Sequence, residues 1–266
     1  MSCNQEPDAG TTRRDFLWGT VKTFTFGAVT LTAIPMFSRG ANAEEKSDGK
    51  PAEEAGKPVL FGYVVDTTKC IGCANCMVAC KYENSVPDGQ FRTWVERYVY
   101  HKDGKIEVDM NTKAPFAFAE KLDVNPDDVS QAFFVPKLCN HCVNTPCIQV
   151  CPVGASYMTK EGVVLIDPKH CIGCSYCVQA CPFGTRFINK RTQVADKCTW
   201  CYHRVMKGLR NACVEVCPVN ARMFGNIDDP DSDISKLLRT KRIDVLKSYL
   251  GTRPKTRYIG LTAEVV

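Results

Sequence analysis

Four tight groups of cysteines constrain the fold of this chain more than any other feature of its sequence. Sixteen of the 17 cysteines belong to these groups, and Cys3 lies outside them. Groups one and three share the spacing C-x2-C-x2-C-x3-C, and groups two, three and four end in Cys-Pro, whereas Lys81 follows group one. In chain order the groups are Cys70, Cys73, Cys76, Cys80; Cys139, Cys142, Cys147, Cys151; Cys171, Cys174, Cys177, Cys181; and Cys198, Cys201, Cys213, Cys217. Thiols this close in sequence either bind metal or cross-link the chain.

The spacing is that of the run with which bacterial ferredoxins bind iron–sulfur clusters. Its short steps aim three thiolates at one cluster, and the x3 step with its proline sends the fourth to the neighbouring cluster of a pair. We expect Gly72 and Gly173 to relieve crowding where the backbone passes close to a cluster. At four thiolates per cubane, the sixteen cysteines predict four [4Fe–4S] clusters as cofactors.

Structural zinc and disulfides are the two weaker interpretations of these cysteines. Group four alone has a spacing that suits one tetrahedral zinc ion, but three-cysteine turns with a displaced fourth do not suit a single ion. An even number of cysteines in an exported chain often means disulfides. Bridges between cysteines separated by two residues are strained, which argues against that use here.

The segments between the groups indicate how the groups pair. Residues 152–170 join groups two and three and predict a short hairpin, with a turn at 161–162 and a β-branched strand at 163–166. This linker is similar to that of a two-cluster bacterial ferredoxin. Its front half recurs at 217–224, after group four, and its back half at 62–66, before group one. Groups one and four should therefore close a second module around the first. Pairing groups three and four is the alternative, but it leaves both half-linkers unused.

The expected ligand sets are named here after the group that supplies three of the cysteines. Set I is Cys70, Cys73, Cys76 and Cys217; set II is Cys139, Cys142, Cys147 and Cys181; set III is Cys171, Cys174, Cys177 and Cys151; set IV is Cys198, Cys201, Cys213 and Cys80. The predicted fold class is α+β, with tandem two-cluster ferredoxin-like modules, one inserted within the other.

Two further segments are expected beside the modules. Alternating residues at 94–100 and 106–109, around the turn at 103–104, predict a surface β-hairpin. Apolar residues at helical spacing predict a helix over 233–250 in the C-terminal tail. The predicted boundaries are 59–90 plus 197–230 for the outer module, 91–132 for the hairpin insertion, 133–196 for the inner module and 231–266 for the tail.

The N-terminus has the features of an export signal. A twin arginine followed by Phe-Leu lies in residues 12–17, a mildly apolar stretch follows at 18–37, and an A-x-A motif ends at Ala43. We expect a twin-arginine (Tat) signal peptide at 1–43, a route that exports folded proteins, and a flexible leader at 44–58. The chain should therefore be periplasmic.

An uncleaved membrane anchor is the alternative for the apolar stretch at 18–37. Its length suits a bilayer, but Lys22, several threonines and Pro35 make it a poor span. No other apolar stretch is long enough, so we expect the mature chain to reach the membrane only through a partner. The formal charge of +5 is offset by about −2 for each oxidised cubane, so no nucleic-acid partner is expected.

The remaining polar residues point to no catalytic site. His141 lies within group two and His203 after group four, and we expect hydrogen bonding near sulfur or surface exposure, since each group already has four thiols. No nucleophile stands beside a base, so no catalytic residue is predicted. Four positive side chains are candidates for raising cluster potentials, although an ordinary surface or structural role is the first interpretation of each: Lys81, Lys137, Lys197 and Arg186.

Taken together, these motifs resemble the iron–sulfur subunit of the dimethyl-sulfoxide-reductase family of molybdopterin oxidoreductases, over most of residues 59–230. The segments C-V-Q-A-C-P-F-G-T-R-F-I-N (177–189) and A-D-K-C-T-W-C (195–201) most resemble the tetrathionate, polysulfide and thiosulfate reductase branch, and also the iron–sulfur partner of nitrite reductases. Some relatives have tryptophan in place of a third-group cysteine and hold a three-iron cluster. Here Cys174 and Cys177 are both present, which implies four cubanes.

The resemblance implies a non-catalytic electron-transfer subunit of anaerobic-type respiration of a sulfur or nitrogen compound. It would relay electrons between a polytopic quinone-binding membrane subunit and a large periplasmic catalytic subunit that holds molybdenum or tungsten with a pterin. A free-standing periplasmic polyferredoxin remains the first alternative, and a zinc-binding interaction module the second.

Overall fold

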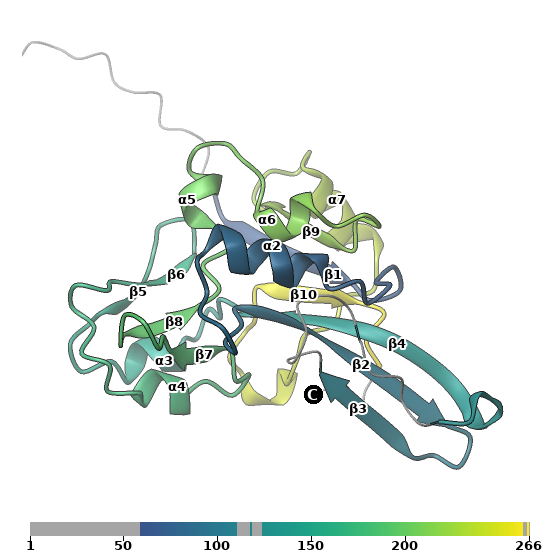
Figure 1. The fold of residues 1–266 in the computed structure, drawn as a ribbon. Helices are drawn as coiled ribbons and strands as arrows, with labels where there is room; N and C mark the ends of the chain where they lie inside the picture. The colour runs from purple at the N-terminus through teal and green to yellow at the C-terminus, as the bar shows by residue number, and fades with distance from the viewer. Residues whose placement is uncertain (1–58, 111–117, 119–123, 263–264, 266) are drawn as a thin grey trace, which may run out of the picture. The chain divides into compact units, whose positions relative to one another are not determined.

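The structure is a computed structural model that describes residues 59–110, 118, 124–262 and 265. The expected signal peptide (1–43) and leader (44–58) lie outside the described residues, as do parts of the expected insertion and tail. Within the described ranges the chain is a mixture of short helices and small sheets (Figure 1).

The first sheet joins segments from opposite ends of the described chain. Its central strand β1 (Phe61–Asp66) pairs antiparallel with β9 (Arg222–Asn226) and parallel with β10 (Thr256–Ile259). Tyr63 and the two residues after it in β1 are completely buried, because neighbouring strands and packed side chains cover this strand. Since β1 leads into cysteine group one and β9 follows group four, this sheet brings those two groups together.

Two short hairpins flank cysteine group three. β5 (Ser156–Met158) pairs with β6 (Val164–Ile166), and β7 (Arg186–Ile188) pairs with β8 (Ala195–Lys197), both antiparallel. The hairpin expected in the linker between groups two and three is therefore present. In Figure 1 these four strands lie together with the short helices α3 and α4.

The expected surface hairpin is also present, but it belongs to a larger sheet. β2 (Thr93–His101) pairs antiparallel with β3 (Ile106–Met110) and, along its whole length, with β4 (Val129–Leu138). The sequence analysis did not predict β4, because its apolar residues do not alternate and Pro136 interrupts it. Pro136 is tolerated because β4 is an edge strand, where one missing backbone donor leaves no ladder bond unmade.

Most of the helices are single turns that follow from the cysteine spacing. α2 (Asn75–Glu83) is the longest of those at the cysteine groups, and it buries Cys76, Met77 and Cys80. The others at the cysteine groups are α3 (Pro146–Gln149), α4 (Tyr176–Gln179), α5 (Tyr202–Val205) and α6 (Ala212–Glu215), whereas the 3-10 turn η1 (Pro126–Asp128) precedes β4. α2 packs against α6, which Figure 1 shows as a blue helix beside a green one.

The helix expected over 233–250 is wrong beyond residue 240. α7 (Asp233–Thr240) begins at Ser232, whose hydroxyl accepts the Ser235 N–H at 3.2 Å. The chain then becomes extended at Lys241 and passes through the 3-10 turn η2 (Ser248–Leu250) into β10. Tertiary pairing overrides the helical periodicity here, since Asp244 forms an antiparallel bridge with Tyr258 of β10 through two backbone hydrogen bonds of 2.9 and 2.8 Å.

The principal core contains cysteines as well as ordinary apolar residues. Tyr63, Trp200 and Tyr258 are its largest members, and they pack with Cys76, Cys139, Cys198 and Cys213. A smaller cluster contains Cys147, Cys177 and Ala195. In the part of the chain that the structure describes, no helix has both the length and the apolar character needed to cross a membrane.

Candidate metal centres

All sixteen cysteines of the four groups are described, and each is a free thiol. Most are buried or half-buried, and Cys174 alone among them is exposed. Burial raises the pKa of Cys76 to about 11 and that of Cys198 to about 12, so bare thiols there would be protonated at neutral pH. A bound metal would hold such side chains as thiolates.

Thiols of set I and set IV come together from groups that are far apart in sequence. Burial raises the pKa of Cys70, and the nearby thiols of Cys217 and Cys73 raise it further. Burial likewise raises the pKa of Cys80, and so do the thiols of Cys198, Cys213 and Cys201. The last cysteine of each group thus lies near the first cysteines of the other group.

Asn84 gives a direct geometric view of this exchange. Its Nδ2 donates to Cys80 Sγ at 3.5 Å and to Cys201 Sγ at 3.8 Å. One side chain at the end of α2 therefore touches a thiol from group one and a thiol from group four.

The four cysteines of set II line a single small cavity, together with Arg186 and Phe183. Burial raises the pKa of Cys142 to about 12, with further contributions from the thiols of Cys139, Cys147 and Cys181. Cys181 is the last cysteine of group three, and it lies near three thiols of group two.

Fewer of these interactions connect the cysteines of set III with one another. Cys171 packs on the small cluster that holds Cys177, and its thiol accepts the Ala195 N–H at 3.4 Å. Burial raises the pKa of Cys151, but hydrogen bonds from the backbone amides of 153–156 outweigh burial and lower it. The convergence of Cys151 with the other three cysteines stays a prediction.

Several buried polar atoms beside these cysteines have no hydrogen-bond partner in the protein. Those that can donate are Nδ2 of Asn140, Nε and Nη2 of Arg186, Nε1 of Trp200 and Oγ1 of Thr252. An unpartnered buried donor costs about 1–3 kcal/mol, so this cluster of them points to an absent acceptor-rich group. The inorganic sulfides and thiolate sulfurs of an iron–sulfur cluster are such acceptors, and the residues present fit that group.

The glycines inside the cysteine runs are crowded by protein atoms. Gly72 and Gly173 have φ of +70° and +69°, and a Cβ there would lie 2.5 Å from the Phe134 ring and from the Gln193 carbonyl oxygen, respectively. We expect these two glycines to relieve crowding beside a cluster. The structure shows that packed protein atoms also leave no room for a side chain there.

His141 and Trp200 form a joint between groups two and four that the sequence analysis missed. Their rings stack with centroids 3.9 Å apart. His141 Nε2 donates to the Cys198 carbonyl oxygen at 3.0 Å, and its Nδ1 accepts the Val164 N–H at 2.9 Å. His141 is therefore bonded to backbone, and burial lowers its pKa well below the usual range. His203, by contrast, is half-exposed and pairs with Glu83 at 2.7 Å.

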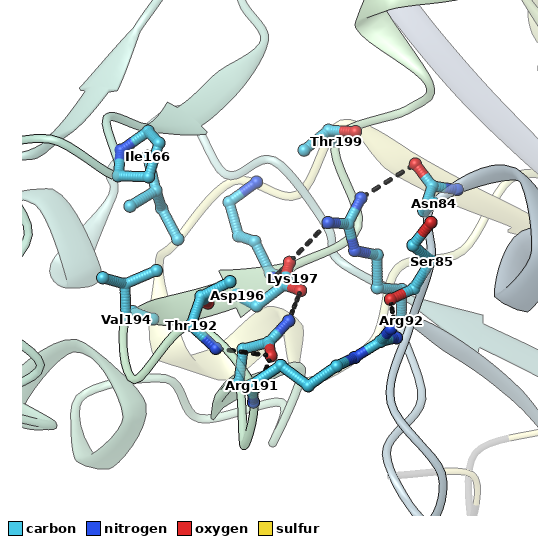
Figure 2. Close-up of a pocket in the computed structure, with 13 residues that line it drawn as sticks. Asn84, Ser85, Arg92, Ile166, Arg191, Thr192, Val194, Asp196, Lys197 and Thr199 are labelled. Atoms are coloured by element: carbon cyan, nitrogen blue, oxygen red, sulfur yellow. Dashed lines mark hydrogen bonds and ion pairs between the residues drawn. The ribbon is translucent and has the colours of Figure 1, made fainter.

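A cavity of about 380 Å³ is lined by residues after α2 and by residues of β8, and a chain of polar contacts joins these two segments. In Figure 2, Arg92 reaches Asn84 on one side and Asp196 on the other. Both contacts are 2.8 Å long, to Asn84 Oδ1 and Asp196 Oδ1. Because Asn84 also touches two thiols, this polar chain connects the thiols of set IV to strand β8.

The four candidate positive side chains have different surroundings. Lys81 pairs with exposed Asp88, and Lys137 forms a 2.7 Å ion pair with half-buried Glu96. Lys197 is buried and donates to the Cys198 carbonyl oxygen at 2.8 Å. Arg186 is the one whose charge interacts with several thiols while its own guanidinium keeps unpartnered donors.

Comparisons with known proteins agree with this chemistry. A family model described as a 4Fe-4S dicluster domain matches residues 130–227. A tetrathionate reductase subunit of Salmonella typhimurium is 43% identical over 222 residues, which cover 82% of this chain and 80% of the relative. A tetrathionate reductase subunit of Archaeoglobus fulgidus is 44% identical over 218 residues, 82% of this chain and 90% of the relative. A polysulfide reductase component of Wolinella succinogenes is 35% identical over 198 residues, 73% of this chain and 91% of the relative.

Proposed function

This chain belongs to the family of iron–sulfur subunits that includes these components of tetrathionate and polysulfide reductases, and we propose that it carries electrons through four [4Fe–4S] clusters within such a complex. A bound cubane takes up and gives back one electron at a time without breaking its thiolate bonds. The protein's part is to hold each cubane by one ligand set, to bury it and to donate hydrogen bonds to its sulfurs.

The exchange of fourth cysteines supports the assignment of sets I, II and IV, and we assign set III by analogy. Cys80 lies near Cys198, Cys201 and Cys213, and Cys217 lies near Cys70. β1 pairs antiparallel with β9, as β5 pairs antiparallel with β6. Two nested ferredoxin-like modules require one such strand pair in each module. We place sets I and IV in the outer module and sets II and III in the inner one.

The neighbours of these cysteines support one linear order of the ligand sets. Cys76 of set I lies near Cys213 of set IV. Cys198 of set IV lies near Cys139 of set II, and Cys147 of set II packs in one cluster with Cys177 of set III. The proposed order is I, IV, II, III. It gives single electrons a continuous route from the cluster of set I to the cluster of set III.

We further propose the partners that the resemblance of the motifs implies; the names of the relatives say only that they are subunits or chains of reductases. A large catalytic subunit with molybdenum or tungsten and a pterin would stand at one end, and a quinone-binding membrane subunit at the other. The substrate class would be an oxidised sulfur compound or a nitrogen compound. The N-terminal motif supports Tat export to the periplasm, with contact to the membrane only through the partner.

The observation that carries this proposal is the convergence of buried thiols from distant groups. Anaerobic purification of the native complex tests it, with iron and acid-labile sulfide measured per chain. The proposal requires about sixteen of each, brown colour and EPR signals from reduced cubanes. Zinc in place of iron would support an interaction module. A chain with its iron but without a pterin-containing partner would support a free-standing polyferredoxin.

A further inference from the structure

Two buried arginines occupy equivalent places in the two halves of the cysteine framework. Arg222 is the fifth residue after Cys217 and begins β9, and Arg186 is the fifth residue after Cys181 and begins β7. Only 1% of Arg222 and 4% of Arg186 is exposed. Arg186 is one of the four positive side chains that the sequence offers as candidates for raising cluster potentials, each with an ordinary role as the first interpretation, and Arg222 is not among them.

Neither guanidinium is neutralised by a carboxylate within the described residues. Arg222 donates from Nη2 to Thr93 Oγ1 at 2.9 Å and from Nη1 to the Tyr63 hydroxyl at 3.5 Å. Arg186 donates from Nη1 to Ser156 Oγ at 3.0 Å, and its Nε and Nη2 have no partner. A buried cation with only neutral partners is costly, so each site needs negative charge from another source.

The thiols around each arginine identify that source. The Tyr63 hydroxyl that accepts from Arg222 lies 3.1 Å from Cys213 Sγ, and Arg186 lines one small cavity with Cys139, Cys147 and Cys181. Cys147 in turn packs in one cluster with Cys177. Cys76, Tyr63 and Cys213 outweigh the effect of burial and raise the pKa of Arg222, and Cys147, Cys139 and Cys177 do the same for Arg186. Arg222 thus lies beside thiols of set I and set IV, and Arg186 beside thiols of set II and set III.

We propose that Arg222 and Arg186 are matched positioning charges, one in each ferredoxin-like module, and that each raises the reduction potential of both clusters in its module. The inference rests on the proposed function, because it needs cubanes at the four ligand sets. Reduction adds one electron to a cubane and breaks no bond, changing the core charge from 2+ to 1+. The added negative charge is stabilised by the guanidinium between the two ligand sets.

The test uses the anaerobically prepared holoprotein, with dithionite as the reductant and EPR at controlled potentials as the readout. Four variants carry it: Arg222→Gln, Arg222→Lys, Arg186→Gln and Arg186→Lys. A unit charge roughly 10 Å away at an effective dielectric of about 20 changes a one-electron equilibrium by about tenfold. That corresponds to a fall of about 59 mV in midpoint potential.

The expected pattern is complementary. Arg222→Gln lowers two of the four midpoint potentials by about 59 mV, and Arg186→Gln lowers the other two by a similar amount. Both lysine variants stay near wild type, because they keep the charge. Arg257→Gln is the matched control, since Arg257 lies in β10 beside β1, and burial is the only influence on its pKa. It should leave all four potentials unchanged.

Three results would overturn the inference while leaving the proposed function intact. The first is an iron-replete Arg222→Gln or Arg186→Gln protein with unshifted potentials. The second is an equal shift in all four clusters. The third applies when a glutamine variant does not load iron: the lysine variant then decides, and a loaded lysine variant with potentials lowered by about 59 mV shows that charge is not the cause. Wild-type protein without iron and sulfide would instead end the proposed function itself.

Discussion

The Tyr63 hydroxyl lies 3.1 Å from the Cys213 sulfur, although 150 residues separate them in the chain. Tyr63 sits in the centre of β1 and Cys213 in α6, and both are buried. Burial raises the pKa of Tyr63 well above its usual value, so this hydroxyl keeps its proton and can donate to a thiolate. The contact links the strand before cysteine group one to a ligand of group four.

We therefore expect Tyr63→Phe to weaken the outer module selectively. The loss of a hydrogen bond to a charged sulfur should lower the free energy of unfolding by about 1.5–3 kcal/mol. It should also lower one cluster midpoint potential, because a donor to sulfur stabilises the reduced state. Thermal unfolding and an EPR redox titration measure the two effects. Tyr249→Phe is the control, since Tyr249 is 75% exposed and should change neither.

The exchange of fourth cysteines can be tested by combining substitutions. Cys80→Ser and Cys201→Ser fall in the same ligand set, so the double variant should lose no more than the about four irons of a single cubane. Cys80→Ser with Cys76→Ser falls in two sets and should lose about eight. Iron analysis of the anaerobic protein distinguishes the cases. If each group of four bound its own cluster, the two double variants would give the reverse result.

The stack of His141 on Trp200 should stabilise the joint between groups two and four. His141→Ala leaves the Val164 N–H unpaired in the core, removes one of the two donors to the Cys198 carbonyl oxygen, and removes the ring that packs on Trp200. We expect a loss of about 2–4 kcal/mol in the free energy of unfolding, measured on the holoprotein. His203→Ala is the matched control, since that histidine is half-exposed, and its effect should stay within about 1 kcal/mol.

Removal of iron should unfold most of the described chain. Cysteines of the ligand sets form part of the principal core, together with Trp200 and Tyr63. Without a cluster, that core keeps buried donors that have no partner. Far-UV circular dichroism after anaerobic chelation should show loss of ordered structure, and rapid proteolysis should follow. A chelated protein that kept its native spectrum would show that the fold is stable without the clusters.

Export should depend on the twin arginine at positions 13 and 14. Arg13→Lys with Arg14→Lys keeps the charge but removes the pair that Tat recognition requires, so the protein should accumulate in the cytoplasm. Cell fractionation and immunoblotting measure the distribution. Lys22→Arg is the control and should be exported normally. Equal export of both variants would show that another route carries the chain.

Part of this fold was predictable because the relevant interactions are local. The turns of the cysteine runs, the hairpin β5–β6 and the hairpin β2–β3 each involve residues close in sequence, where spacing and turn residues decide the geometry. The recurrence of half-linkers even indicated that the ends of the framework meet. β4 was missed because its pairing with β2 decides it, and the helix was extended too far beyond Thr240 because Asp244 pairs with Tyr258 instead.

By itself, the sequence determined the class of metal chemistry, since the number and spacing of the sixteen thiols do not depend on the path of the backbone. Only the tertiary structure decided what surrounds those thiols. Arg222 beside Cys76, and His141 stacked on Trp200, arise from segments more than 50 residues apart. No local pattern specifies such contacts, because the free energy that holds them comes from burial shared by the whole core.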